Sequence, residues 1–263
     1  MNNLIIMQDI QNNEDNRNIK IKEVGIKNII LPLYISDKAK KKQLVVAKIK
    51  MSVDLAKNCR GTHMSRFVEI IEHYRGYDFN GRSFPQILNE LKKKLDAKSA
   101  LIEVSFNYFI EKKSPISKKK GLMNYQCKII GKIVKNKKIE TSLNVLVPIS
   151  CVCPCSMAIS DYGAHNQRGA VSLKVQTNKF VWLEDLIFLV EKYGGSSDIY
   201  SLLKRKDEKY ITEKMFKNPK FVEDVVRDIA ANLKNDPRIN KYSVECTNFE
   251  SIHNHNAYAK ITS

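Results

Sequence analysis

The 263-residue sequence lacks any apolar run close to the roughly 20 residues that span a bilayer. Near its start, Leu4–Met7 is too short for the apolar core of a signal peptide, and no basic segment precedes it. These absences exclude a membrane-spanning helix and predict a cytoplasmic protein. In that reducing compartment, the six cysteines favour metal binding or catalysis over a disulfide framework.

Acidic residues are few beside basic ones, 28 against 45, which gives a formal net charge of +17. Such a charge suits nucleic acid, a membrane surface or a phosphorylated small molecule. The sequence is rich in Lys, Asn and Ile throughout, and this composition explains the positive charge equally well. The only short runs, Lys40–Lys42 and Lys118–Lys120, lack the interleaved aromatic residues of single-strand binders. We therefore expect neither nucleic acid nor a membrane as partner, while a phosphate-bearing substrate fits the charge.

The sequence also lacks the paired Cys-x-x-Cys spacing of structural zinc sites. It does gather three cysteines, a histidine and an arginine within residues 151–168. Pro154 is expected to hold Cys153 and Cys155 on a stiff, non-helical turn, and His165 to follow in a loop. A thiolate beside an imidazole forms either a metal site or a nucleophile with its base. The alternative interpretation is that the cysteines are buried structural thiols and that His165 lies on the surface without a functional role.

Hydrophobic periodicity predicts the order strand, strand, helix, helix, strand, strand twice over. In the first half, strands at 21–35, 45–55, 101–110 and 125–134 enclose helices at 64–74 and 83–95. In the second half, strands at 139–147, 170–177, 242–249 and 257–261 enclose helices at 183–193 and 219–233. We therefore expect an α+β fold of two tandem units, each an antiparallel four-stranded sheet with two helices on one face.

The expected domain organisation has three parts. Residues 1–20, rich in Asn and almost without apolar residues after Ile10, predict a disordered tail. The first unit then covers 21–135 and the second 136–263, with the boundary near Asn136. No sequence identity is visible between the halves, so the duplication concerns architecture alone.

Two polar clusters suggest binding of phosphate or metal. Arg60, His63 and Arg66 lie at a predicted strand-to-helix junction, where backbone N–H groups and the helix dipole favour an anion. A helix cap with surface arginines is the alternative. The charged segment 202–213 is expected to connect two helices, and its Glu208 can reach a metal formed elsewhere, although such a run is usually a solvated face.

Two further clusters carry carboxylates and histidines. Glu223 lies in the first turn of a predicted helix, where the dipole favours a carboxylate regardless of function. Glu250, His253 and His255 lie between the strands predicted at 242–249 and 257–261, in a stretch that is also expected to be strand-like. Burying them there is costly unless they bind a metal or relay protons. One thiolate, several imidazoles and two or three carboxylates together suit a catalytic divalent metal, Zn²⁺, Mn²⁺ or Fe²⁺.

Six segments, taken in this order, resemble those of the prokaryotic type IB GTP cyclohydrolases. They are Arg60-Gly-Thr-His-Met-Ser-Arg-Phe67, Cys153-Pro-Cys-Ser156, Tyr162-Gly-Ala-His-Asn-Gln-Arg168, Leu202-Leu-Lys-Arg-Lys-Asp-Glu208, Phe221-Val-Glu-Asp224 and Phe249-Glu-Ser-Ile-His-Asn-His255. The resemblance extends over about residues 25–260. It implies a tandem tunnelling fold and the conversion of GTP to 7,8-dihydroneopterin triphosphate and formate, the entry to folate and related pterins.

The resemblance also implies roles for individual residues. Cys153 matches the thiolate at the metal, and the polar residues around that metal match His165, Glu208, Glu250 and His253. Which of them bind the metal and which relay protons stays open. Glu223 matches the carboxylate that holds the guanine edge. We assign the triphosphate to five basic residues, Arg60, His63, Arg66, Lys204 and Arg205.

Two positions depart from the family pattern. Lys206 stands where we expect proline, and Ser196-Ser-Asp198 is unusual before Ile199. Neither is a proposed ligand, so the expected consequence is a more mobile loop. Cys151 and Cys155 are expected to be structural.

The implied mechanism is metal-assisted hydrolysis, in which water attacks C8 of guanine and His165 or His253 carries a proton to the departing nitrogen. A tunnelling-fold nitrile reductase, acting on a deazapurine with Cys153 as nucleophile and NADPH as reductant, is the rival enzyme, and the histidine–carboxylate cluster argues against it. A basic nucleic-acid-binding protein with a structural metal is the rival from another class.

The sheets are expected to drive self-association. An open sheet exposes edge strands that must be paired or covered, and neither 139–147 nor 257–261 carries protective charge or proline runs. Closing chains edge to edge forms a barrel with closed symmetry. We therefore expect a homo-oligomer, specifically a tetramer, with active sites at subunit contacts.

Overall fold

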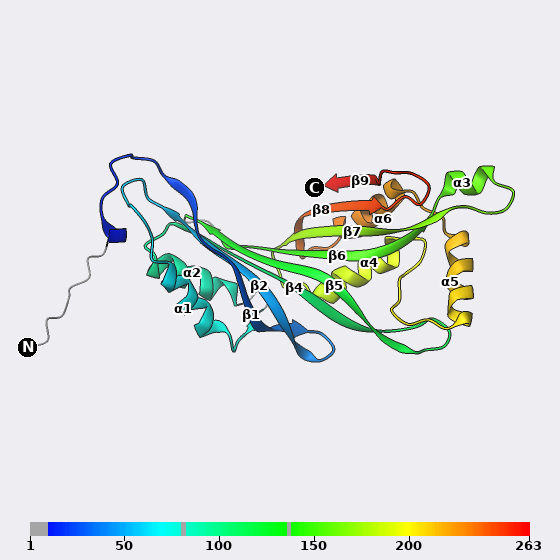
Figure 1. Ribbon diagram of the computed structural model, residues 1–263, viewed down its shortest axis with the longest axis horizontal. Helices are drawn as coiled ribbons and strands as arrows, with labels where there is room; N and C mark the ends of the chain where they lie inside the picture. The colour runs from blue at the N-terminus through cyan, green and yellow to red at the C-terminus, as the bar shows by residue number, and fades with distance from the viewer. Residues whose placement is uncertain (1–9, 80–82, 136–137) are drawn as a thin grey trace, which may run out of the picture. The chain divides into compact units, whose positions relative to one another are not determined.

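The computed structural model describes residues 10–79, 83–135 and 138–263, and it is a mixed α and β structure (Figure 1). The described strands form one nine-stranded sheet in the order β3-β1-β2-β4-β5-β6-β7-β8-β9. The predicted order of strands and helices is confirmed in both halves. Four elements lie beyond that order: a short 3-10 helix η1, a short strand β3 and two helices, α3 and α5.

The chain divides into two compact units that do not follow a single cut. The first unit contains the described residues up to Ser36 together with those of Lys40–Val104 and Ile130–Thr141. The second contains Asp37–Ala39, Ser105–Ile129 and Ser142–Ser263. Strands β4 and β5 therefore contribute residues to both units. The expected boundary near Asn136 lies outside the described residues.

The first unit combines two helices, which contact each other, with long strands and a short strand β3 that pairs parallel with β1. Its elements are β1 (Ile21–Asp37), β2 (Lys41–Leu55), α1 (Met64–Tyr74), β3 (Asp78–Phe79) and α2 (Phe84–Lys94), and it shares β4 (Ser99–Lys113) and β5 (Lys120–Val134) with the second unit. Alternate residues of β2, such as Val45, Ala47 and Ile49, are buried, as the period of two predicts. Gly131 of β5 has no space for a side chain, because a Cβ there would lie 2.4 Å from the Phe84 ring of α2.

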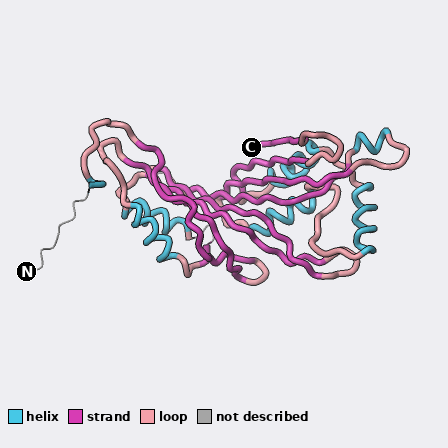
Figure 2. Tube along the Cα trace, viewed as in Figure 1, coloured by secondary structure: helices cyan, strands magenta, loops and turns pink. Residues whose placement is uncertain are grey.

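The second unit repeats this scheme with additions. Its elements are β6 (Glu140–Val152), α3 (Pro154–Ile159), β7 (Asn166–Thr177), α4 (Leu183–Tyr193), α5 (Arg205–Lys217), α6 (Val222–Lys234), β8 (Ile239–Asn248) and β9 (Ala257–Thr262). Strands β7, β8 and β9 pair antiparallel. Helices α4 and α6 contact each other and these strands through buried residues such as Ile187, Val190 and Ile229. Helix α5 stands apart from both, as Figure 2 also shows.

The sheet order corrects one expectation about its edges. Strand β6 lies between β5 and β7, so residues 139–147 do not form an edge. Strand β9 pairs only with β8 among the described strands and is the edge on that side. The sequence could not show this, because β6 reads as the start of a new unit while its backbone groups pair on both sides.

Residues 10–20 have defined contacts, in contrast to the disordered tail that the composition predicts. Ile10–Asn12 form a short 3-10 helix, η1, and Glu14 bridges to Cys59. The N–H groups of Arg60 and Gly61 donate to the carbonyls of Asn13 and Gln11 at 3.1 Å each. Backbone pairing thus holds a polar segment that has little apolar surface to bury.

Candidate functional site

Cys153 lies where β6 ends and α3 begins. It is the N-cap of α3, and its Sγ accepts a hydrogen bond from the Ser156 N–H at 3.4 Å. The expected non-helical turn is therefore wrong: Pro154 is the first residue of a helix. Proline suits that position because its fixed φ is already helical and its missing N–H needs no partner. As a result Cys153 is half-buried, while Cys155 in the first turn is exposed.

The structure links His165 to Cys153 through the backbone. The Cys153 N–H donates to the His165 carbonyl at 3.2 Å, and the His165 N–H donates to Ser156 Oγ at 3.2 Å. The chain returns from α3 through Gly163, whose φ of +131° favours glycine. Thiol and imidazole thus share one backbone-linked junction.

The imidazole of His165 is held by two further side chains. Its Nδ1 lies 2.9 Å from Oε1 of Gln167 and 3.4 Å from Oγ of Ser251. Gln167 is buried at an inward-facing position of β7. Sequence reasoning missed both partners, although a polar residue in phase with the buried Val171 and Leu173 was an available signal.

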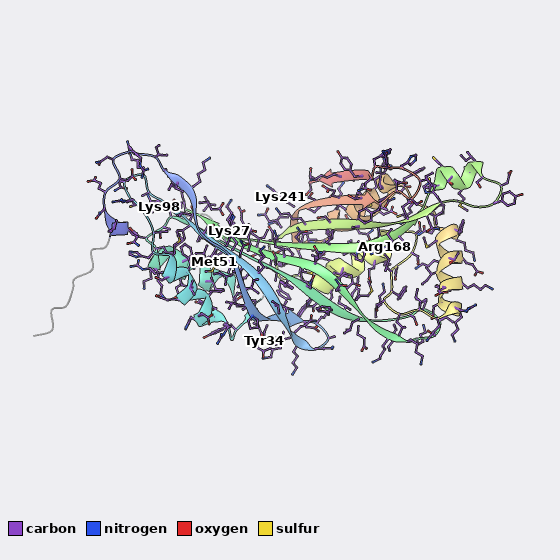
Figure 3. The ribbon with its side chains drawn as sticks, in the orientation of Figure 1. Lys27, Tyr34, Met51, Lys98, Arg168 and Lys241 are labelled. Carbon is purple, nitrogen blue, oxygen red and sulfur yellow. The ribbon has the colours of Figure 1, made fainter. Side chains whose placement is uncertain are left out.

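Ser251 brings the loop between β8 and β9 to the same place. The pair Asn248–Ala257 closes the strands, and the Phe249 N–H donates to the Arg168 carbonyl at 2.9 Å. Figure 3 labels Arg168 at this end of the β7–β8 pair and Lys241 at the other. Helix α3, the 249–256 loop and α5 lie at the same end of the second unit (Figure 1).

The predicted strand position of Glu250, His253 and His255 is wrong, because β8 ends at Asn248. Glu250 is half-buried and both histidines are exposed, so the cost of burial does not apply to them. Their imidazoles stack with ring centroids 5.1 Å apart and an interplanar angle of 18°. The loop therefore presents two imidazoles to solvent beside the His165 junction.

Two carboxylates lie close to buried thiols beneath this junction. Burial raises the pKa of Cys151, and the charge of Glu250 adds to the rise, while the hydrogen bonds that involve Ser196 and Asn248 act against it. Burial likewise raises the pKa of Cys246, with contributions from Cys151 and Glu223. Both thiols are thus neutral at physiological pH, consistent with structural roles. Cys153 differs from them in being half-buried at the surface junction.

Glu223 lies in the first turn of α6 and is exposed, as its predicted helix position requires. The start of α6 is tied to the end of β6 through Lys220. The Lys220 N–H donates to the Val152 carbonyl at 3.2 Å, and Nζ donates to the Tyr193 carbonyl at 2.7 Å and to Asp228 at 2.8 Å. Glu223 is therefore anchored to the segment that carries Cys153.

Lys204, Arg205 and Glu208 surround the first turn of α5, and all three are exposed. The expected charged connection is in fact a helix. The residues of α5 are mostly polar, and only Asp207 among them is fully buried. The sequence therefore has no apolar stripe there from which a helix could be predicted. The pKa of Asp207 is well below its ordinary range: burial alone would raise it, but hydrogen bonds from Ser117, Lys204 and Ile116 outweigh burial.

Arg60, His63 and Arg66 belong to the first unit and lie at the β2–α1 junction, as predicted. His63 is the N-cap of α1, and Arg60 is exposed. The guanidinium of Arg66 donates to the Lys94 carbonyl at 2.7 Å, which ties α1 to the end of α2. This group belongs to the first unit, whereas the Cys153–His165 junction belongs to the second.

The described contacts join Cys153, His165 and the 249–251 segment, but they do not join Glu208 to them. Across residues 10–79, 83–135 and 138–263, no three Cys, His, Asp or Glu side chains converge closely enough to hold a metal ion. Nor does any helix there combine the length and apolar content needed to cross a bilayer. The cytoplasmic location stays a prediction.

The fold is that of known tunnelling-fold enzymes. Uricase from Arthrobacter globiformis superposes with a TM-score of 0.55 at 7% identity over 92% of each chain. Urate oxidase from Bacillus subtilis 168 gives a TM-score of 0.53 at 9% identity, covering 92% of this chain and 98% of that one. At such identity the likeness concerns the fold alone, and it confirms the predicted tandem tunnelling fold.

Sequence comparison identifies the family within that fold. The model described as type I GTP cyclohydrolase FolE2 matches residues 7–259. GTP cyclohydrolase FolE2 of Syntrophobacter fumaroxidans is 52% identical over 255 residues, which cover 97% of this chain and 98% of the relative. The protein of that name from Thermosipho africanus is 48% identical over 257 residues, 98% of each chain. The chain belongs to the type I GTP cyclohydrolase FolE2 family.

Proposed function

We propose that the protein is a GTP cyclohydrolase of type IB, which hydrolyses GTP at C8 to 7,8-dihydroneopterin triphosphate and formate and so begins folate or pterin synthesis. One observation carries the proposal: in a chain of this family, the Cys153–His165 junction joins two of the family's motif segments. The 249–251 segment, from a third such motif, reaches the same imidazole through Ser251.

The site is proposed to use a divalent metal, Zn²⁺, Mn²⁺ or Fe²⁺. Cys153, His165, Glu250 and His253 are the side chains that would hold it, with Glu208 as a further candidate from α5. One thiol, two imidazoles and carboxylates form a mixed donor set of the kind found at catalytic sites. A bound ion of this type acidifies water toward neutral pH and thereby supplies the nucleophile.

The residues around His165 fit its proposed work. When Nδ1–H donates to Gln167, the lone pair of Nε2 is directed away from that bond and is available to a metal or a proton. The exposed His253 is the second group able to carry a proton to the departing ring nitrogen. Ser251 and Gln167 therefore act as orienting groups for one of the two imidazoles.

Substrate recognition is divided among the other clusters. The exposed carboxylate of Glu223 accepts hydrogen bonds from the paired N–H donors of the guanine edge, an interaction strengthened by its charge. Lys204 and Arg205, at the start of α5, bind the triphosphate, and Arg60, His63 and Arg66 are the other basic residues that we assign to it.

A homo-oligomer, specifically a tetramer with sites at subunit contacts, is part of the proposal. The edge strand β9 exposes Tyr258, and the α3 region exposes Ile159 and Tyr162 at 86% and 102% of their full areas. Large exposed apolar side chains and an open sheet edge are both features of surfaces that pair in assemblies. Light scattering of the active preparation checks this, and full activity in a monomer would contradict it.

The decisive experiment is turnover of GTP by the purified protein after removal and return of the metal. With Mn²⁺ or Zn²⁺ we expect a pterin chromophore and one formate per GTP consumed, and with a chelator neither product. Consumption of NADPH with a deazapurine nitrile, without a metal and without formate from GTP, would instead establish the rival enzyme.

A further inference from the structure

Asp207 is a fully buried carboxylate at the start of α5, whose other residues are exposed or half-buried. Its side chain accepts four hydrogen bonds: Oδ1 from the N–H groups of Ile116 at 2.8 Å and Ser117 at 2.7 Å, and Oδ2 from the Lys204 N–H at 2.8 Å and the Ser117 hydroxyl at 2.5 Å. Three of these donors belong to the turn between β4 and β5. The fourth is the N-cap of α5.

The turn that receives α5 is itself well fixed. The Ser114 N–H donates to the Lys119 carbonyl at 2.9 Å, and Ser114 Oγ lies 2.7 Å from Ser117 Oγ and accepts from the Lys119 N–H at 3.0 Å. A side chain bonded to this turn therefore has a defined position rather than one that follows a mobile loop.

The same bonds bring two basic segments together. Lys118 and Lys119 follow Ser117 directly, while Lys204 and Arg205 adjoin Asp207 in the helix. Segments of like charge repel each other. A carboxylate bonded to both segments offsets that repulsion and holds them side by side. An apolar residue at position 207 could be buried equally well, but it could neither accept the hydrogen bonds from the two segments nor offset their positive charge.

The far end of α5 has separate attachments. Ser150 Oγ donates to the sulfur of Met215 at 3.4 Å, and the ring of Phe216 lies 3.5 Å from the Cβ position of Gly163. Loss of the Asp207 bonds would therefore free the first turn of α5 without detaching the whole helix. Lys204 and Arg205, at that first turn, are the residues whose placement would change most.

We propose that Asp207 is a positioning residue for triphosphate recognition: it fixes the first turn of α5 on the β4–β5 turn so that Lys204 and Arg205 meet the phosphates. This inference rests on the proposed function and extends it to a residue that contacts no substrate. Its ligand class is a linear polyphosphate chain, bound independently of the guanine base.

The test uses Asp207→Asn in the full-length protein. Asn has the same shape and its oxygen can still accept from Ile116 and Ser117, but its NH₂ faces the Lys204 N–H, so two donors oppose each other. We measure the affinities of inorganic tripolyphosphate and of guanosine by calorimetry. Tripolyphosphate should bind about 10-fold more weakly, as for the loss of one hydrogen bond to a charged group, with guanosine unchanged.

Asp236→Asn is the matched control. Asp236 also accepts several hydrogen bonds, from Arg238 at 2.7–3.2 Å, but it lies in the turn before β8. It should lower stability without changing tripolyphosphate affinity. If Asp207→Asn does not fold, Ser117→Ala removes the hydroxyl bond to Asp207, together with the bond to Ser114 Oγ, and should weaken tripolyphosphate binding about threefold.

Unchanged tripolyphosphate affinity in the folded Asp207 or Ser117 variant would overturn the positioning role. Equal losses for tripolyphosphate and guanosine would also overturn it, since they would indicate general disruption. The proposed function fails in a different way. Wild-type protein that binds tripolyphosphate, with the predicted loss in Asp207→Asn, but releases no formate from GTP would keep the positioning role and reject the cyclohydrolase.

Discussion

The two units share one order of strands and helices but differ in what lies between these elements. In the first unit, β2 passes to α1 through a short segment that ends at the N-cap His63. In the second, α3 is placed between β6 and β7, and α5 between α4 and α6. Cys153 and His165 flank the first of these additions, and Glu208 lies in the second. The repeated framework supplies the hydrophobic core, while the added connections carry part of the proposed metal site.

The units also differ in what their buried carboxylates hold in place. In the first, Asp54 accepts from the N–H groups of Lys98 and Ser99 at 2.9 and 2.7 Å and pairs with Lys20 at 3.0 Å, which joins strand ends. In the second, Asp207 joins a turn to a helix beside proposed binding residues. Asp54 thus joins the ends of two strands, whereas Asp207 joins a helix to a turn.

The largest effect is expected from Cys153→Ala compared with Cys155→Ala. Loss of the proposed metal thiolate should lower turnover more than about 100-fold, since even residues behind metal ligands change activity by 10- to 100-fold. Metal content should fall with it. Cys155→Ala, two positions on in the exposed first turn of α3, should retain both. Turnover of GTP and the amount of bound metal are measured for both variants. Full activity in both would show that the Cys153 thiolate takes no part in the mechanism.

A smaller effect is expected from Glu223→Gln. The amide keeps the shape but presents a donor to guanine N–H groups, and hydrogen bonds to charged groups contribute roughly 1.5–3 kcal/mol. The kcat/KM for GTP should therefore fall about 10- to 100-fold, with metal content unchanged. Steady-state kinetics and metal analysis test this together. Loss of metal in this variant would show that Glu223 is a ligand and not a guanine anchor.

The smallest effect on turnover is expected from Asp54→Asn in the first unit. Burial alone would raise the pKa of Asp54, but bonds from Lys20, Ser99 and Lys98 outweigh burial and hold the pKa below its ordinary 3.8. Its contribution to stability is therefore fully present above pH 3.8 and is lost as pH falls through the lower folded-state pKa.

Unfolding curves of wild type and Asp54→Asn should accordingly differ at pH 7 and converge in acid. The substitution should cost about 1–3 kcal/mol at pH 7, because buried donors lose their acceptor, while kcat for GTP stays the same. If the free energies of unfolding of the two proteins changed with pH in the same way, Asp54 would not be the group whose titration destabilises the protein in acid. A large loss of kcat would contradict the division of roles between the units.

The sequence predicted the framework well because periodicity reports burial. The alternation in β2 and the apolar faces of α4 and α6 fixed both type and order of those elements. Periodicity also placed strands at 242–249 and 257–261, close to the observed β8 and β9. The separate expectation that His253 and His255 lie in strand is wrong, because pairing stops at Asn248. Motif order placed Cys153 and His165 near each other, and the structure shows the backbone bonds between them.

By itself the sequence determined the tandem α+β fold, the family and most of the proposed site residues, because these depend on local periodicity and on side-chain types. Tertiary structure alone decided that residues 205–217 form a helix and where that helix lies. Its buried attachment is a carboxylate, Asp207, bonded to a turn about 90 positions earlier in the chain. Hydrogen bonds between distant segments leave no periodic trace in either segment, so only the folded chain shows them.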